Sequence, residues 1–294
     1  MNINLYGLLI AAAITIGYFL CAKEEKARQL PKDTAIDIVL YSIPFAIIGA
    51  RLYYVAFAWN SFKYNIISIF YIWQGGLAIY GGIIGGLFGL YLLSKKRHLP
   101  LPLLTDVISP SLILGQAIGR WGNYFNQEAH GKIVQDIAWQ FFPAAVNISG
   151  QWYYATFFYE SAWNLIGFIF LYLSRKKYYK NHGIITIWYI TVYSLGRMVI
   201  EMMRTDSLML GSIRVSQGLS ILLFVIAVVL LSKKSYAPIY VYILLFAGSA
   251  TVIIAAMRES MMCLFLGALI LLITSVIVYL NMEKRRKLAK TDNI

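Results

Sequence analysis

One short segment of the chain concentrates polar side chains directly after an apolar run. The segment 115–131, GQAIGRWGNYFNQEAHG, contains Arg120, Asn123, Asn126 and Glu128. A guanidinium can grip a phosphate through two parallel hydrogen bonds, and asparagine amides can donate to its other oxygens. The alternative is a boundary arginine that extends to the membrane surface, with a polar loop behind it. Two asparagines and a glutamate beside the arginine favour a site for a charged lipid head group.

A second segment places an arginine and a carboxylate within an apolar run. Arg197 and Glu201 are four residues apart, so they can pair on one face of a helix, and Arg204 is predicted to extend that face. A buried structural ion pair is the alternative. An intramembrane arginine with a carboxylate partner more often marks a pathway or a site. We therefore predict that this segment contributes to the site.

Arg51 is a lone arginine within the apolar run 36–59. Such a charge must find an anion or a polar cavity, because it is costly in an apolar environment. A structural carboxylate partner, Glu160 or Asp106, is the alternative to a role in binding.

A glycine-rich segment follows Gln74. Its regular part repeats every four residues and predicts a face on which another helix approaches closely; it consists of Gly81, Gly85 and Gly89. The pair Gly75–Gly76 precedes the apolar run, where bare backbone can approach a ligand. Tyr80 follows this pair, and we predict that it belongs to the site.

The composition indicates that the segments that carry these groups lie in a membrane. The chain of 294 residues is 60% hydrophobic and 13% charged, with a mean hydropathy of +0.66, which is typical of a membrane protein. Its apolar runs have about the length that one crossing helix needs; they are 5–22, 36–59, 77–94, 103–119, 156–174, 183–203, 216–232, 237–257 and 260–281. The fourth is short and is interrupted by Pro110. The predicted fold is an all-α polytopic transmembrane helical bundle.

The distribution of basic residues predicts the orientation. Most of the 26 Lys and Arg residues lie after the first, third, fifth and seventh runs and in the tail. The positive-inside rule then places the N-terminus outside and the C-terminus in the cytoplasm, with the Arg120–Glu128 segment at the outer face. The net charge of +13 is attributed to topology and contact with anionic membrane lipids. No basic patch interleaved with exposed aromatic residues suggests nucleic acid as a partner.

The sequence offers no metal site, because its two cysteines and three histidines are scattered over separate segments. It also shows no Ser–His–Asp pattern and no nucleotide-binding pattern.

Several spaced motifs resemble one family. GRWGNYFNQEAHG is similar to the signature Gly-Arg-x-Gly-Asn-Phe-x-Asn-x-Glu-x-x-Gly of the prolipoprotein diacylglyceryl transferases. The resemblance spans roughly residues 6–220 in the expected order: Tyr6-Gly7, Gly49-Ala50-Arg51-Leu52, GGLAIYGG, Asp106 to Gly131, Tyr159-Glu160 and Gly196-Arg197-x-x-x-Glu201-x-x-Arg204-x-Asp206.

The resemblance also defines a domain organisation and two departures. It implies a transferase domain of about seven core spans over residues 1–235, followed by an additional transmembrane hairpin and basic cytoplasmic tail over 236–294. Many family members carry histidine where this chain has Tyr80. They commonly have His-Pro where this chain reads Tyr154-Ala155.

The resemblance implies an enzyme of the bacterial plasma (inner) membrane. Such an enzyme moves the diacylglyceryl group of phosphatidylglycerol onto the lipobox cysteine thiol in the signal peptide of a prolipoprotein. A thioether forms and glycerol phosphate leaves, with no cofactor or metal. Displacing a phosphate from carbon requires a thiolate and stabilisation of charge on the departing oxygens, which fits the polar groups described above.

Roles can then be assigned to the candidate residues. Arg120 and Arg197 would stabilise the leaving phosphate, and Glu201 would orient Arg197. Glu128 or Tyr80 would assist thiol deprotonation or bind the glycerol hydroxyls. The predicted substrate-binding residues are Asn123, Asn126, Gly75, Gly76, Gly131, Arg51, Arg204, Tyr6 and Tyr193.

Two other functions stay open at this point. One is a transporter or scramblase that binds an anionic lipid without reacting it, and the other is a non-catalytic homologue that binds lipids or signal peptides. A transporter is expected to show internal repeats or broken helices at the bilayer midplane. The polar groups of this chain instead gather in the predicted outer half.

Overall fold

The computed structural model describes residues 5–210 and 213–291. Its helices form two compact units, which are described separately. Unit 1 contains residues 1–14, 112–178 and 184–294, and unit 2 contains residues 15–111 and 179–183. Helices α1 (Leu5–Ala27) and α5 (Leu101–Phe125) each contribute residues to both units.

Unit 2 is built around two long helices. They are α2 (Thr34–Phe57) and α4 (Ile79–Arg97), and the short helices α3 (Trp59–Phe62), η1 (Ile66–Phe70) and η2 (Ile72–Gln74) connect them. Its buried core draws on α1, α2, α4 and α5 and contains Cys21, Ala35, Ile38, Leu90, Leu93, Leu104 and Val107.

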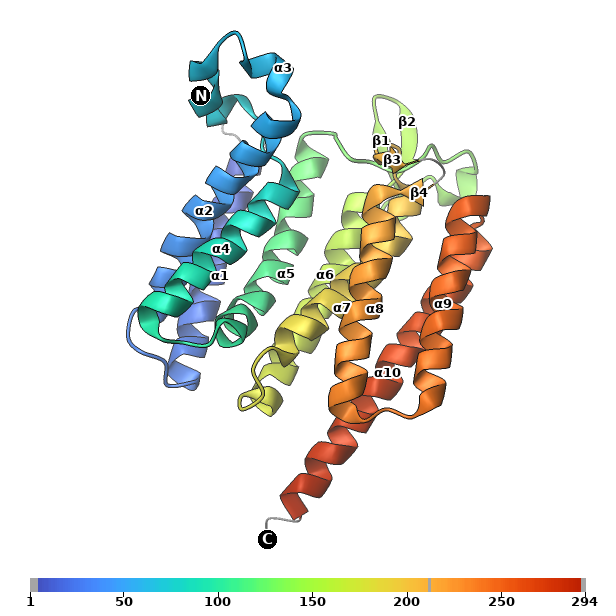
Figure 1. The fold of residues 1–294 in the computed structure, drawn as a ribbon. Helices are drawn as coiled ribbons and strands as arrows, with labels where there is room; N and C mark the ends of the chain where they lie inside the picture. Colours follow the sequence, from blue (N-terminus) through green and yellow to red (C-terminus); the bar gives the residue numbers. More distant parts are fainter. Residues whose placement is uncertain (1–4, 211–212, 292–294) are drawn as a thin grey trace. The chain divides into compact units, whose positions relative to one another are not determined.

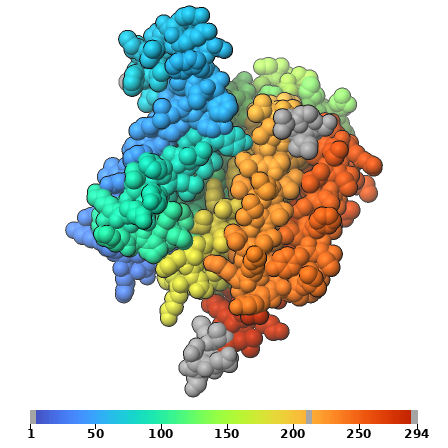
Figure 2. All heavy atoms as spheres, viewed as in Figure 1, coloured from blue at the N-terminus to red at the C-terminus, as the bar shows by residue number. Residues whose placement is uncertain are grey.

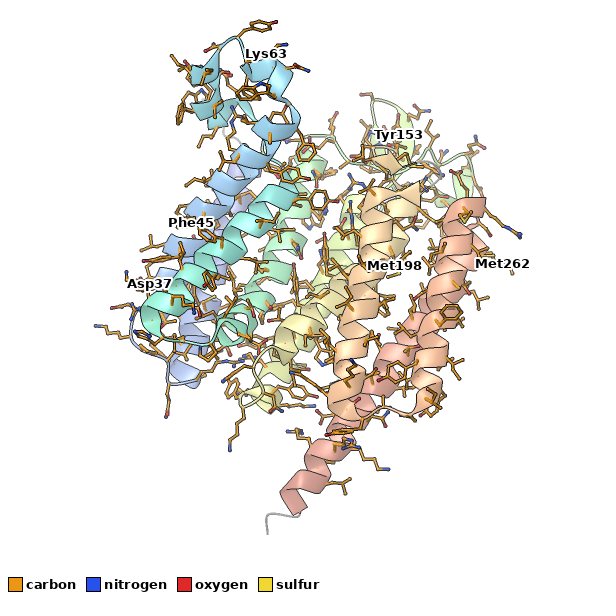
Figure 3. The ribbon with its side chains drawn as sticks, viewed as in Figure 1. Asp37, Phe45, Lys63, Tyr153, Met198 and Met262 are labelled. Atoms are coloured by element: carbon orange, nitrogen blue, oxygen red, sulfur yellow. The ribbon has the colours of Figure 1, made fainter. Side chains whose placement is uncertain are left out.

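The glycine repeat of α4 packs directly on the backbone of α2. A Cβ atom at Gly85 would collide with the carbonyl oxygen of Phe45, which Figure 3 labels on α2. Gly81 and Gly89 contact the carbonyl oxygens of Gly49 and Tyr41 in the same way. The predicted face for close helix approach is therefore confirmed.

Unit 1 is a larger helical assembly. Its helices are α6 (Thr156–Ser174), η4 (Arg175–Tyr178), α7 (Ile184–Ile200), η5 (Glu201–Met203), α8 (Val215–Ser235), α9 (Ile239–Arg258) and α10 (Met261–Thr291). Side chains of α8 and α9 meet on the face shown in Figure 2. One buried cluster joins these helices and includes Trp188, Met198, Phe224, Leu231, Leu245, Leu264 and Leu271.

The connection between α5 and α6 carries extended structure. It contains η3 (Ile137–Trp139) and an antiparallel hairpin of β1 (Ala145–Ile148) and β2 (Gln151–Tyr154), which lies beyond the helix ends of unit 1 (Figure 1). A second antiparallel pair, β3 (Met209–Leu210) and β4 (Ile213–Arg214), precedes α8. The connection between α5 and α6 is thus partly a small sheet.

The helix lengths agree with a multi-pass membrane protein. Within the described residues, seven helices are long and apolar enough to cross a membrane: α1, α2, α5, α7 extended by η5, α8, α9 and α10. Helices α4 and α6 also match predicted runs and have 19 residues each. They are less apolar, since α4 ends in three basic residues and α6 carries Glu160 and Asn164, so their crossing stays a prediction.

Helix α5 differs from its predicted run of 103–119. It continues through Pro110 to Phe125 and has 25 residues. The polar residues after 119 were expected in a loop, but α-helical geometry persists because Arg120 and Asn123 find partners on that face.

Candidate functional site

Arg120 and Asn123 lie in the last turns of α5. Their spacing of three residues places them on one helix face, and Arg120 Nη1 donates to Asn123 Oδ1 at 3.2 Å. This contact holds one side of the guanidinium next to an amide that has hydrogen-bonding capacity of its own.

Glu160 connects the two predicted arginines. Its Oε1 lies 2.6 Å from Arg120 Nη2, and its Oε2 lies 3.1 Å from Arg197 Nη1. The carboxylate comes from the first half of α6, and only 3% of its side chain is exposed. A carboxylate with both oxygens engaged by arginines fixes the planes of both guanidinium groups.

Glu201 holds the other side of Arg197. Its Oε2 lies 2.6 Å from Arg197 Nη2, which confirms the predicted pair. Ser216, in the first turn of α8, donates its hydroxyl to Glu201 Oε1. Arg197 is therefore held between two carboxylates contributed by α6 and η5.

The charges of this cluster nearly cancel, because Arg120 and Arg197 face Glu160 and Glu201. The carboxylates are almost fully buried, whereas 21% of the Arg120 side chain and 15% of the Arg197 side chain are exposed. The cluster therefore offers a ligand N–H donors in fixed directions. It offers little net positive charge.

Glu128 is fixed by amides. Asn123 Nδ2 donates to its Oε1 at 3.1 Å, and Asn126 Nδ2 donates to the same oxygen at 3.3 Å. The backbone N–H of Glu128 also donates to the carbonyl of Asn123. Asn123 therefore belongs to both groups, since it accepts from Arg120 and donates to Glu128.

Arg204 does not extend the helical face of Arg197, and that prediction is wrong. Helix α7 ends at Ile200, and after η5 the backbone of Arg204 is extended. Arg204 Nη2 lies 2.6 Å from Asp206 Oδ2, and its backbone forms an antiparallel bridge with Gly131. The extended chain thereby ties the ends of two separate motifs together.

Gly131 has no room for a side chain. A Cβ atom there would lie 2.7 Å from Tyr154 Cβ and 2.9 Å from its carbonyl oxygen. The final glycine of the first motif is therefore required by packing against β2, whatever its contact with substrate.

The two predicted tyrosines of unit 1 both contact helices of the site. The Tyr6 ring lies against Gly122, where a Cβ atom would overlap it. Tyr193 lies one turn before Arg197 and stacks on Tyr189, with ring centroids 6.0 Å apart. Tyr6 thus packs on α5, which carries Arg120, and Tyr193 is part of α7, which carries Arg197.

Arg51 is held by main-chain carbonyl groups. In unit 2 it donates to Ile69 and Ser68, each at 2.7 Å, to Gly75 at 2.7 Å, to Gly76 at 3.1 Å and to Tyr71 at 3.5 Å. The structural partners weighed from the sequence were carboxylates. The observed partners show that Arg51 shapes the backbone of segment 68–76.

The remaining candidates of unit 2 adjoin that segment. Gly75 and Gly76 have φ angles of 88° and 72°, a region that favours glycine. Tyr80 lies in the first turn of α4, partly exposed, with its ring centroid 6.3 Å from that of Tyr53. These residues form their own group within unit 2.

The sequence motifs did not predict Glu160 or Ser216 as site residues. Glu160 was predicted as an alternative partner for Arg51 and as part of the Tyr159-Glu160 motif, but it was given no role in the site, although it is the lone carboxylate in the run 156–174. Nothing in the sequence marked Ser216, because its role depends on the packing of α8 beside η5.

Comparison with known proteins identifies the family of this chain. Residues 1–233 match the family described as prolipoprotein diacylglyceryl transferase. Three similar proteins are each named phosphatidylglycerol--prolipoprotein diacylglyceryl transferase. The protein of Streptococcus suis (strain 05ZYH33) is 43% identical over 248 residues, which cover 82% of this chain and 92% of that protein.

The other two proteins give the same result. That of Halalkalibacterium halodurans is 47% identical over 232 residues, covering 76% of this chain and 80% of that protein. That of Listeria monocytogenes is 42% identical over 234 residues, covering 78% and 84%. Matches of this extent, together with the signature residues gathered around Glu160, place the chain in the prolipoprotein diacylglyceryl transferase family.

Proposed function

We propose that this chain transfers the diacylglyceryl group of phosphatidylglycerol to the lipobox cysteine of prolipoproteins, the first step of lipoprotein maturation. The names of its relatives supply the substrates. The observation that carries the proposal is the shared carboxylate of Glu160, which holds Arg120 and Arg197 in one network. Two fixed guanidinium groups suit a phosphate that gains charge as it leaves.

The reaction is a displacement at carbon. The thiol loses its proton, the thiolate attacks the glyceryl carbon, and the bond from that carbon to the phosphate oxygen breaks. A thioether forms, and glycerol phosphate departs with the bonding electron pair. Arg120 and Arg197 stabilise the departing oxygens with the N–H groups that Glu160 and Glu201 leave free.

The other residues of unit 1 bind and orient the substrates. Asn123 and Asn126 orient the head group, and Glu128 binds a glycerol hydroxyl or accepts the thiol proton. The peripheral contacts to substrate are assigned to Tyr6, Tyr193, Gly131 and Arg204.

In unit 2, Tyr80 contributes its hydroxyl as a hydrogen-bonding group. Arg51 keeps Gly75 and Gly76 in the conformation in which their backbone can meet lipid. None of these steps requires a cofactor or a metal.

The site belongs on the outer side of a bacterial plasma membrane. The basic loops favour a chain with its N-terminus outside and its C-terminus in the cytoplasm. Residues 1–235 would form the transferase domain and residues 236–294 an added transmembrane hairpin with a basic cytoplasmic tail. The lipobox segment of the signal peptide would then reach the site from the membrane.

The test combines purified protein, phosphatidylglycerol vesicles and a synthetic lipobox peptide. We expect the cysteine of the peptide to gain the mass of a diacylglyceryl group and free glycerol phosphate to appear in equal amount. Arg120→Ala should lose both products, whereas Arg258→Ala, on the exposed end of α9, should keep them.

Movement of labelled phosphatidylglycerol across the vesicle bilayer without a thioether would contradict the proposal. It would support the lipid transporter instead. Binding of the peptide without either process would support a non-catalytic homologue.

A further inference from the structure

Among the residues that the structure describes, the small sheet of unit 1 has one edge with a backbone partner and one edge without. Segment 131–134 covers β2: Gly131 N–H donates to Tyr154 O at 2.9 Å, Tyr154 N–H to Lys132 O at 3.0 Å, and Val134 N–H to Trp152 O at 2.8 Å. The opposite edge of the sheet is β1. Figure 3 labels Tyr153 on this hairpin.

The hydrogen-bond pattern identifies which residue faces away from the sheet. Residues of a strand point their backbone groups alternately to the two sides. Since Trp152 and Tyr154 bond segment 131–134, Gln151 and Tyr153 bond β1. The register pairs them with Ile148 and Val146. Asn147, between those two, therefore directs its N–H and C=O toward the free edge.

The turn of the hairpin agrees with this assignment. Ser149 and Gly150 have φ angles of 51° and 87°, as in a two-residue turn whose flanking residues form a hydrogen-bonded pair. Those flanking residues are Ile148 and Gln151. Asn147 also supports the turn, because its side-chain oxygen accepts from Gly150 N–H at 3.1 Å.

A cavity of about 310 Å³ lies along this edge. β1 contributes Val146, Asn147 and Ile148 to its wall. The lining also includes Asn123 and Glu128; Asn123 accepts from Arg120 and donates to Glu128. The cavity next to β1 and the arginine network thus share the residue Asn123.

We propose that the acceptor polypeptide binds β1 as an added antiparallel or parallel strand, with one of its side chains in this cavity. The inference rests on the proposed function and names the part of the site that holds the protein substrate. An extended peptide is the ligand that such an edge recognises, because it satisfies exposed backbone groups while a neighbouring pocket selects a side chain.

The charges of the cavity define the preferred side chain. Glu128 is its one carboxylate, and the described lining includes no lysine or arginine. An acidic side chain would meet like charge there. Acidic side chains are therefore disfavoured there, and the residues that follow the lipobox cysteine are proposed to run along β1, away from the arginines.

Two substitutions at one position isolate the edge. Asn147→Ala removes the side chain and its bond to Gly150 but keeps the backbone N–H. Asn147→Pro removes the N–H as well, at a position where no bond of the sheet is lost. We measure KM for a synthetic lipobox peptide, continued beyond its cysteine by uncharged residues, and KM for phosphatidylglycerol.

Relative to Asn147→Ala, Asn147→Pro should raise KM for the peptide about three- to tenfold, the effect of one hydrogen bond. KM for phosphatidylglycerol should not change. A single N-methyl group at the peptide position that faces Asn147 removes the N–H that donates to the Asn147 carbonyl, so it should raise the peptide KM by a similar factor with the unmodified protein. Equal peptide KM values for the two variants, or parallel rises for both substrates, would overturn the proposal.

A binding measurement separates this proposal from the proposed function. A photoreactive p-benzoylphenylalanine in place of Asn147 should capture the biotinylated peptide in detergent without phospholipid, and at Ile137, which is exposed in the same loop, it should not. Capture of the peptide at position 147, with no diacylglyceryl transfer by the unmodified protein in phosphatidylglycerol vesicles, would support peptide binding at β1 and refute the transferase. Transfer without capture at Asn147 would refute the edge alone.

Discussion

Glu160 Oε1 lies 2.6 Å from Arg120 Nη2, although the two residues are 40 positions apart in the sequence. The same carboxylate also holds Arg197 through its other oxygen. A single side chain of α6 therefore sets the separation of the two arginines, and the geometry of the proposed phosphate site depends on it.

Glu160→Gln is expected to lower the transfer rate by roughly 10- to 100-fold. An amide keeps the shape but presents only one oxygen, so one guanidinium loses a charge-assisted partner. The rate is measured as diacylglyceryl transfer at saturating substrates. Asp37→Asn is the control, because it removes another arginine partner, that of Arg97 at 2.5 Å, outside the proposed site. An unchanged rate for Glu160→Gln would show that it does not position the arginines.

Arg120→Lys and Arg197→Lys should each reduce transfer on the order of 10²-fold. Arg120 reaches Asn123 and Glu160 with different nitrogens, and Arg197 likewise spans two carboxylates. A single ammonium group cannot keep both contacts in plane. Arg258→Lys serves as the control for loss of an arginine, and full activity of both site variants would exclude the phosphate clamp.

Tyr80→Phe is expected to lose only part of the activity, equivalent to about 1 kcal/mol for one hydrogen bond. The loss is limited because the Tyr80 hydroxyl acts as a hydrogen-bonding group and is not required as the base. Tyr80→His should retain substantial activity, because imidazole also forms hydrogen bonds there. Tyr91→Phe, later on α4, is the control. Abolished turnover with intact lipid binding in Tyr80→Phe would identify an obligate proton carrier.

Gly85→Ala should destabilise the packing of α2 on α4 by about 1–3 kcal/mol, because the added methyl group meets the Phe45 carbonyl. Gly82→Ala is the matched control on the same helix. Its Cβ would approach other atoms no closer than 3.7 Å, so its stability should stay within about 0.5 kcal/mol of the parent. Unfolding in detergent is followed by loss of helical signal. Equal stabilities would contradict the close backbone contact.

The orientation predicts opposite labelling of two exposed positions in intact cells. With Cys263→Ser as background, Gln135→Cys should react with an impermeant thiol reagent, and Lys176→Cys should be protected until the cells are opened. Gln135 lies in the connection that carries β1, and Lys176 lies in η4. The reverse labelling would put the arginine network on the cytoplasmic side and remove the proposed substrate access.

Hydropathy and local spacing predicted the helices and the pair of Arg197 with Glu201, because both depend on residues that are close together in the sequence. Contacts between distant segments were beyond such patterns. The sequence gives no measure of which helix faces another, so the double role of Glu160 was missed. The end of α7 at Ile200 was also missed, since the predicted run continued to residue 203, whereas the chain changes to the helix η5 at Glu201.

Arg51 illustrates a different limit. Its charge within an apolar run correctly indicated a need for polar partners, but the partners are carbonyl groups that exist only once segment 68–76 has folded around it. The hairpin of β1 and β2 likewise has a recognisable Ser149–Gly150 turn, yet its short strands lie between the apolar runs 103–119 and 156–174, where hydropathy predicts no element.

The burial of α10 has a consequence for the order in which the protein is made. Three side chains of α10 are fully buried against the other helices of unit 1: Leu264, Leu271 and Val278. The ribosome synthesises them after the helices that they contact. Until α10 is synthesised, lipid tails cover the helix surfaces that it will contact. These tails are as apolar as the leucines that replace them. A chain that stops after residue 235 would therefore remain inserted in the membrane, with lipid on the helix surfaces that α9 and α10 otherwise cover. A separately synthesised α9–α10 hairpin could then pack on these surfaces without refolding of the rest.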